Sequence, residues 1–201
     1  MKHNIIEAIK QRPLMFDGAM GTMIYQHGVF LNACYDELCL TQPKLILGIH
    51  QEYVDAGADV IETNTFGANR IKLEPYGLAD RAADINRAAV KLARDAAGEN
   101  VYVAASVGPC YMPGQEPEKD GLKLARESFF EQMEILASEG IDLVVLETFH
   151  DMVHLQAAAE AAKKFKLPVL ASFALPPVAG DDPSKDQGEG AMALVLDKDA
   201  S

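Results

Sequence analysis

The stretch IDLVVLET (residues 141–148) is the part of the chain that decides the fold. It is a nearly unbroken run of β-branched and leucine residues, which is typical of a strand buried on both faces. A strand with one face in water would instead alternate apolar and polar residues. Four further apolar runs predict strands of the same kind: residues 14–16, 58–65 (ADVIETNT), 101–107 (VYVAASV) and 167–174 (LPVLASFA).

Helical patterns separate these strands along the chain. Residues 43–57 start with a proline, carry apolar residues at helical spacing and end at a glycine. Residues 80–98 are rich in alanine, and residues 122–138 and 152–166 complete the series, with 190–196 as a candidate fifth helix. Strands that alternate with helices of this length predict a parallel sheet covered by helices, an α/β fold.

The number of these units limits the architecture. Residues 176–190 (PPVAGDDPSKDQGEG) are polar and rich in Pro and Gly, which predicts an exposed loop rather than a linker between domains. We therefore expect one domain over residues 1–201. A complete eight-stranded TIM-type barrel takes about 250 residues, so a barrel built from this chain would be incomplete, with about five of its eight βα units.

Composition narrows the class of ligand. The chain has 30 acidic and 18 basic residues and a net charge of -12, which repels nucleic acid and anionic membranes and favours a small-molecule ligand. No apolar run approaches the ~20 residues of a membrane span, and the first residues lack the features of a signal peptide. We therefore expect a cytoplasmic protein. Its three cysteines predict free thiols rather than a disulfide framework.

Polar residues gather where the predicted strands end. Asp17 follows the first strand and Glu147 ends the fourth. Because the carboxyl ends of parallel strands meet at one edge of a sheet, the two carboxylates predict a site for an amino group. Gly18 and Gly21 leave backbone N–H groups open to a carboxylate. Helix capping by the carboxylates and a tight turn at the glycines are the structural alternatives.

Four blocks in order resemble the homocysteine S-methyltransferase family. They are FDGAMGT (16–22), AGADVIETNTFGANRIKL (56–73), SVGP (106–109) and VLETF (145–149). The first two blocks are most similar in form to the homocysteine module of cobalamin-dependent methionine synthases. This resemblance implies a (β/α)₈ barrel that transfers a methyl group to homocysteine, whose thiol is activated by bound zinc.

The resemblance also implies roles for individual residues. Asp17 and Glu147 would hold and orient the amino end of homocysteine, and the backbone at Ala19 and Met20 would cradle its carboxylate. The remaining candidates, Thr63, Asn64 and Thr65, line the end of the second strand and are expected to have supporting roles, with hydrogen bonding within the loop as an equal alternative to direct contact. Phe66 and Phe149 are expected to be pocket wall or core.

The zinc ligands that the resemblance implies are three cysteines, one near the sixth strand's end and a pair near the eighth strand's end. The sequence has no Cys-Cys pair and is expected to stop before those positions. A substitute set of Cys34, Cys39 and Cys110 has weak spacing for zinc, and ordinary free thiols are the favoured alternative. His50, His150 and His154 are another candidate set of metal ligands. Their predicted places in or at the start of helices favour solvated or packed side chains instead.

Two functions stay open on these grounds. The chain is either a methyltransferase domain or a binding or assembly module that keeps the amino-acid pocket without turnover. An aldolase-type barrel would need a Schiff-base lysine at a strand end, and none is found there. Methylcobalamin, S-methylmethionine and betaine all remain candidate methyl donors. Cobalamin or folate domains, or self-association through unpaired sheet edges, are the implied partners.

Overall fold

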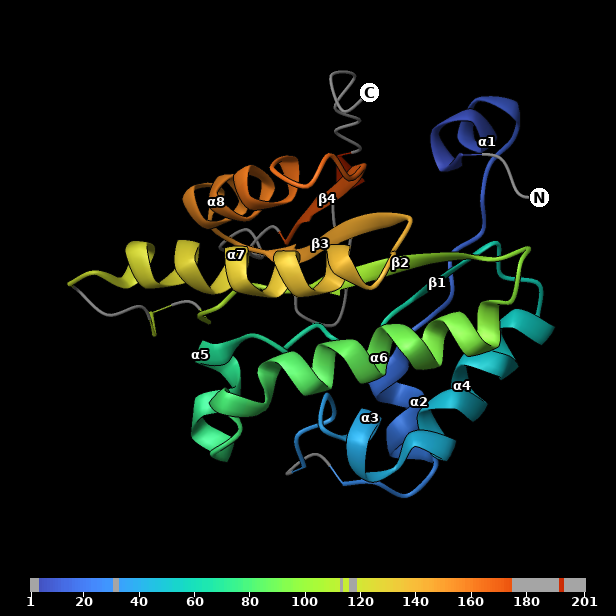
Figure 1. Cartoon of the computed structure of the whole chain (residues 1–201), viewed down its shortest axis with the longest axis horizontal. Helices are drawn as coiled ribbons and strands as arrows, with labels where there is room; N and C mark the ends of the chain where they lie inside the picture. The colour runs from blue at the N-terminus through green and yellow to red at the C-terminus, as the bar shows by residue number, and fades with distance from the viewer. Residues whose placement is uncertain (1–3, 31–32, 113, 116–118, 175–191, 194–201) are drawn as a thin grey trace, which may run out of the picture.

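A five-stranded sheet forms the centre of the computed structural model, which describes residues 4–30, 33–112, 114–115, 119–174 and 192–193. The strands lie side by side in chain order, and the first four are parallel (Figure 1). They are β1 (Val60–Glu62), β2 (Tyr102–Val107), β3 (Leu143–Phe149), β4 (Val169–Phe173) and β5 (Met192–Ala193). Phe16 adds one parallel bridge to Val60, where the sequence predicted the first strand.

The four long helices fall where their patterns predicted them. They are α4 (Pro43–Asp55), α6 (Ala82–Ala97), α7 (Gly121–Ser138) and α8 (Met152–Lys163). The short elements were not predicted: α1 (Ile5–Gln11), α2 (Met20–Gln26), α3 (Leu38–Thr41), α5 (Arg70–Leu73), η1 (Glu74–Tyr76) and η2 (Ala79–Arg81). None of the described helices combines the length and the apolar composition that crossing a bilayer requires.

The sheet buries a different set of side chains on each face. Figure 1 shows α6 and α7 running alongside β2 and β3. Val144 and Leu146 of β3 join the main core beneath α6, α7 and α8, while Leu143 and Val145 join a second cluster that includes Ile5 of α1. Successive strand residues point to opposite faces, so both faces of β3 are apolar, as the unbroken run in the sequence indicated.

The C-terminal part of the sheet departs from the prediction. Residues 192 and 193 form β5 rather than a helix, and they pair antiparallel with Ser172 and Ala171 of β4. We expected the outer edge of β4 to stay unpaired. This expectation is wrong at Ala171 and Ser172, because β5 pairs with the edge of β4 there. The predicted loop at 176–190 lies outside the described residues.

A histidine in α4 is buried without a hydrogen-bond partner among the described residues. His50 of α4 is fully buried, and neither ring nitrogen has a hydrogen-bond partner among the described residues. Burial lowers its pKa to about 4, so the imidazole is neutral in the folded chain at neutral pH.

We expect His50 to make the fold sensitive to acid. The unfolded chain takes up a proton on this ring as the pH falls below about 6.5, whereas the folded chain resists protonation down to about 4. The free energy of unfolding therefore falls by about 3 kcal/mol as the pH drops from about 6.5 to about 4. Urea unfolding of H50L should show a smaller loss of stability between pH 7 and 4.5, and H27L at an exposed histidine is the control. Equal acid sensitivity of H50L and the unaltered chain would contradict this account.

Candidate active site

A cavity of about 500 Å³ opens at the carboxyl ends of β1, β2 and β3. All of the residues that the sequence predicted to bind substrate line it: Asp17, Gly18, Ala19, Met20, Thr63, Asn64, Thr65 and Glu147. Gly21 also lines it and lies in the first turn of α2, so the predicted glycine turn continues directly into a helix. The other lining residues are Tyr35, Asp36, Glu62, Phe66 and Ser106.

Four carboxyl groups line this cavity, and three of them interact through their charges: those of Asp17, Glu62 and Glu147. Oδ2 of Asp17 accepts a hydrogen bond of 2.9 Å from the backbone N–H of Glu62, and Glu147 accepts one from the Ser106 hydroxyl. Burial raises the pKa of Asp17 to about 7 despite its backbone hydrogen bonds, and the charge of Glu147 adds to the increase. Burial raises the pKa of Glu62 to about 9, reinforced by the charges of Glu147 and Asp17.

No lysine or arginine is among the described residues that line the cavity. Carboxylates that crowd a partly buried site without a cation raise each other's pKa, which the shifts of Asp17 and Glu62 show. A positively charged ligand group would remove this cost, whereas an anion alone would increase it. The electrostatics of the pocket therefore favour a ligand with an ammonium group.

A bulge at the end of β3 lets Glu147 and Phe149 face opposite sides of the sheet. Leu146 pairs with Ala171 and Phe149 with Phe173, so two residues of β3 lie opposite one residue of β4. Thr148 takes a φ of 62°, a conformation rare for a β-branched residue. The extra residue keeps Glu147 at the pocket and returns Phe149 to the helix-facing core.

Hydroxyl and amide groups fix the loop that follows β1. The hydroxyls of Thr63 and Thr65 lie 2.6 Å apart, and Thr65 donates to the carbonyl of Ser106 at 2.7 Å. The side-chain amide of Asn64 donates to the carbonyl of Tyr35 at 2.7 Å. These bonds tie the end of β1 to β2 and to the segment before α3, so the three residues fix the loop in the described structure.

Asp36 and Glu62 had no predicted role. Asp36 accepts a hydrogen bond of 3.0 Å from the backbone N–H of Gly67, and burial raises its pKa to about 6. Glu62 interrupts an apolar strand, which is a sequence signal, whereas Asp36 lies in an irregular segment that offers none. Both residues reach the cavity only through contacts between segments that are far apart in the chain.

The cysteines are not brought together into a metal site. Cys34 belongs to the core cluster around Leu73, Cys39 to the one around Ile46, and Cys110 to the main core. Burial raises the pKa of Cys39 and of Cys110 to about 12, so both are protonated thiols at neutral pH. Within the described part of the chain, no group of three His, Cys, Asp or Glu residues could hold a metal ion. The described residues therefore do not fit zinc.

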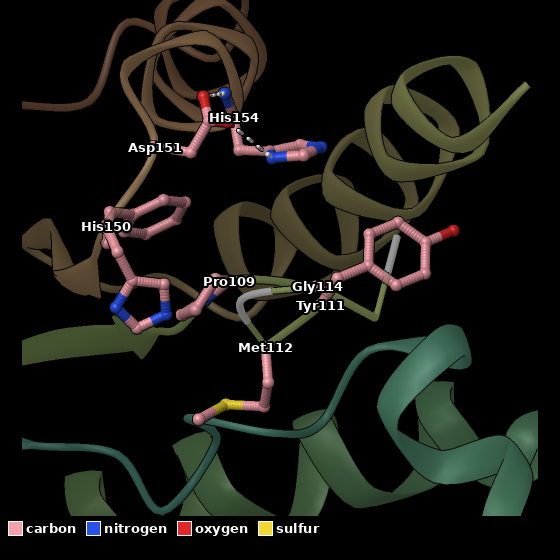
Figure 2. Close-up of a pocket in the computed structure, with 8 residues that line it drawn as sticks. Pro109, Tyr111, Met112, Gly114, His150, Asp151 and His154 are labelled. Atoms are coloured by element: carbon pink, nitrogen blue, oxygen red, sulfur yellow. Dashed lines mark hydrogen bonds and ion pairs between the residues drawn. The ribbon is translucent and has the colours of Figure 1, made fainter. Parts of the chain in front are cut away.

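The three histidines do not form one set either. His50 is buried in α4, while His150 and His154 line a separate small pocket of about 70 Å³. Figure 2 shows this pocket, with Asp151 and His154 at the top of the view, His150 at the left and Tyr111 at the right. Nδ1 of His154 lies 3.9 Å from a carboxylate oxygen of Asp151. This arrangement belongs to the start of α8 and is separate from the carboxyl cluster.

The comparisons with known proteins agree with this geometry. The family model described as homocysteine S-methyltransferase matches residues 14–197. The chain belongs to this family. Over 176 residues it is 31% identical to the methionine synthases of Mycobacterium leprae (strain TN) and of Mycobacterium tuberculosis (strain ATCC 25618 / H37Rv). Each alignment covers 80% of this chain and 14% of the relative, so the chain matches only a small part of those proteins.

Solved structures of the family share the fold. The oxidized form of the homocysteine methyltransferase MmuM from Escherichia coli matches with a TM-score of 0.73 and 25% identity, over 85% of this chain and 66% of that one. Its metallated form gives 0.71 and 23%, over 83% and 65%. This likeness confirms the predicted α/β barrel class, and the sheet is open in the described residues of this chain.

Gly108 packs against Phe66, which lines the cavity, and offers a test of the geometry. A Cβ atom at Gly108 would lie 2.4 Å from the ring of Phe66, a lining residue, so G108A should displace that ring. We expect a loss of stability of about 1–3 kcal/mol, the range for overpacking. The control is G48A in α4, where a Cβ meets nothing within 4 Å and alanine favours the helix. Urea denaturation measures both variants, and a G108A chain as stable as G48A would show that Phe66 is misplaced.

Proposed function

We propose that this chain forms the amino-acid-binding part of a homocysteine S-methyltransferase site. One observation carries the proposal: Asp17 and Glu147, from separate strand ends, share a cavity of about 500 Å³ whose described lining includes no lysine or arginine. A cavity of this volume is within the usual range for small-molecule sites. Its excess of carboxyl groups suits the ammonium group of an amino acid.

Different residues of the site bind different groups of the ligand. Asp17 and Glu147 accept hydrogen bonds from the ammonium group, and the backbone of Gly18, Ala19 and Met20 faces the ligand carboxylate. Gly18 has little room for a side chain, because a Cβ there would lie 3.0 Å from the hydroxyl oxygen of Tyr53. Thr63, Asn64 and Thr65 keep the loop after β1 in place through the hydrogen bonds described above. The sulfur end of homocysteine extends into the rest of the cavity.

The chemical outcome is methyl transfer to the sulfur of homocysteine, which gives methionine. The described residues bind and orient the amino acid, and they include no thiolate set that fits the zinc implied by the family. This observation favours a second candidate, in which the chain binds homocysteine or methionine without turnover. Both candidates use the same pocket, so ligand binding tests what they share, and a methyl-transfer assay separates them.

Replacing Glu147 by Gln should weaken homocysteine binding by about 1.5–3 kcal/mol, or about 10- to 150-fold in Kd, because one hydrogen bond to a charged group loses its anion. Stability should change little, since the substitution also relieves repulsion among the three carboxyl groups. Calorimetric titration of both chains with L-homocysteine measures the effect, and E127Q at an exposed position on α7 is the control. Unchanged affinity with a large loss of stability would show that Glu147 is structural.

A further inference from the structure

We infer that Glu62 works in this pocket as a neutral carboxylic acid that donates a hydrogen bond to Glu147 and so orients that carboxylate toward the ligand. The inference rests on the proposed function, since it takes the ligand to be an amino acid held by its ammonium group. It gives Glu62 the role of a positioning residue. It also sets the pocket's charge, because a neutral Glu62 leaves Asp17 and Glu147 to carry the negative charge that a bound ammonium group offsets.

The hydrogen-bond directions support this division of roles. Glu62 ends β1, Glu147 ends β3, and Ser106 of β2 lies in the strand between them. Glu62 and Glu147 both line the cavity, and a hydrogen-bond interaction with Glu147 contributes to the raised pKa of Glu62. The Ser106 hydroxyl already donates to Oε1 of Glu147, which makes Glu147 the acceptor on that side. A bond between two carboxyl groups needs one proton, and Glu62 is the member that can donate it.

The groups around Glu62 favour its neutral form. The titratable side chains that face it are Asp17, from the loop before α2, and Glu147 of β3. Asp36 and Tyr35 also line the cavity, and no Lys or Arg does so in the described structure. Burial, the two negative charges and the hydrogen bond to Glu147 all raise the pKa of Glu62, to about 9. At neutral pH the proton therefore stays on Glu62.

A neutral Glu62 matches the charge of the expected ligand. Three anions around one ammonium group would leave the pocket with an excess negative charge, and the ligand's own carboxylate would add to it. With Glu62 protonated, two carboxylates receive the three N–H donors of the ammonium group. The hydrogen bond from Glu62 occupies one oxygen position on Glu147 and restricts its rotation, so the remaining lone pairs are aimed at the ligand.

Two substitutions at Glu62 separate this role from a charged or a purely structural one. E62Q keeps a neutral hydrogen-bond donor of nearly the same shape, and E62L removes the donor. The probe is L-methionine, because its thioether has no acidic proton and thiol ionisation cannot contribute. Calorimetric titration at pH 7.5 should give E62Q an affinity within about threefold of the unaltered chain and E62L at least about tenfold weaker. E127Q serves as the control.

Two outcomes of that titration would overturn the inference. If E62Q loses as much affinity as E62L, Glu62 acts as an anion. If E62L binds as well as the unaltered chain, Glu62 does not position Glu147. If the unaltered chain binds neither methionine nor homocysteine, the proposed function fails, and the inference is then decided by a measurement that needs no ligand.

That measurement is the pH dependence of thermal stability. A carboxyl group whose folded pKa is raised favours the folded state in its protonated form, so its contribution is lost as the pH rises from about 4.5 towards the folded value near 9. E62Q cannot ionise, so its Tm should fall less than that of the unaltered chain between pH 5 and 8, by about 5 °C or more. Parallel Tm curves for the two chains would show that Glu62 does not hold a proton.

Discussion

The crowding of three carboxyl groups in one pocket is the constraint on which the site depends. Asp17, Glu62 and Glu147 come from three segments that are far apart in the chain, and the parallel sheet brings their ends to one edge. Such a cluster is costly unless a proton or a cation offsets the charge. Without a ligand, the raised pKa values of Asp17 and Glu62 reflect the free-energy cost of ionising them in this cluster. A ligand with an ammonium group would lower that cost.

The rest of the fold holds this unfavourable cluster in place. The main core between the sheet and α6, α7 and α8 fixes β2 and β3, and the bulge at Thr148 keeps Phe149 in this core although Glu147 lines the cavity. On the other side of the pocket, Asn64 and Asp36 hold the loop after β1 against the segment before α3. The free energy of folding comes from the apolar layers, which lets the polar edge be arranged for binding.

The sequence predicted the regular part of this structure well. Unbroken apolar strands and alanine-rich helices depend on local periodicity, so β2, β3, α6 and α7 were found close to their observed bounds. The residues at the strand ends followed from the rule that parallel sheets bind ligands there. Short elements such as α2 and α3 span too few residues for periodicity to reveal them.

The features that the sequence did not predict depend on contacts between distant segments. β5 is defined by its pairing with β4, and no pattern in residues 190–196 indicates an antiparallel partner. Glu62 was placed at a strand end, but its role depends on the relative positions of β1, β2 and β3, which bring its side chain to Glu147. The placement of the three cysteines in separate core clusters is likewise a tertiary property.

The claim that the pocket recognises an ammonium group is tested most directly by removing that group from the ligand. L-homocysteine and 4-mercaptobutanoate differ only in the amino group and share the thiol and the carboxylate. Calorimetric titration of the 201-residue chain should show homocysteine binding at least about tenfold more tightly, since the analogue leaves Asp17 and Glu147 without their cation. Equal affinity for the two ligands would contradict the account.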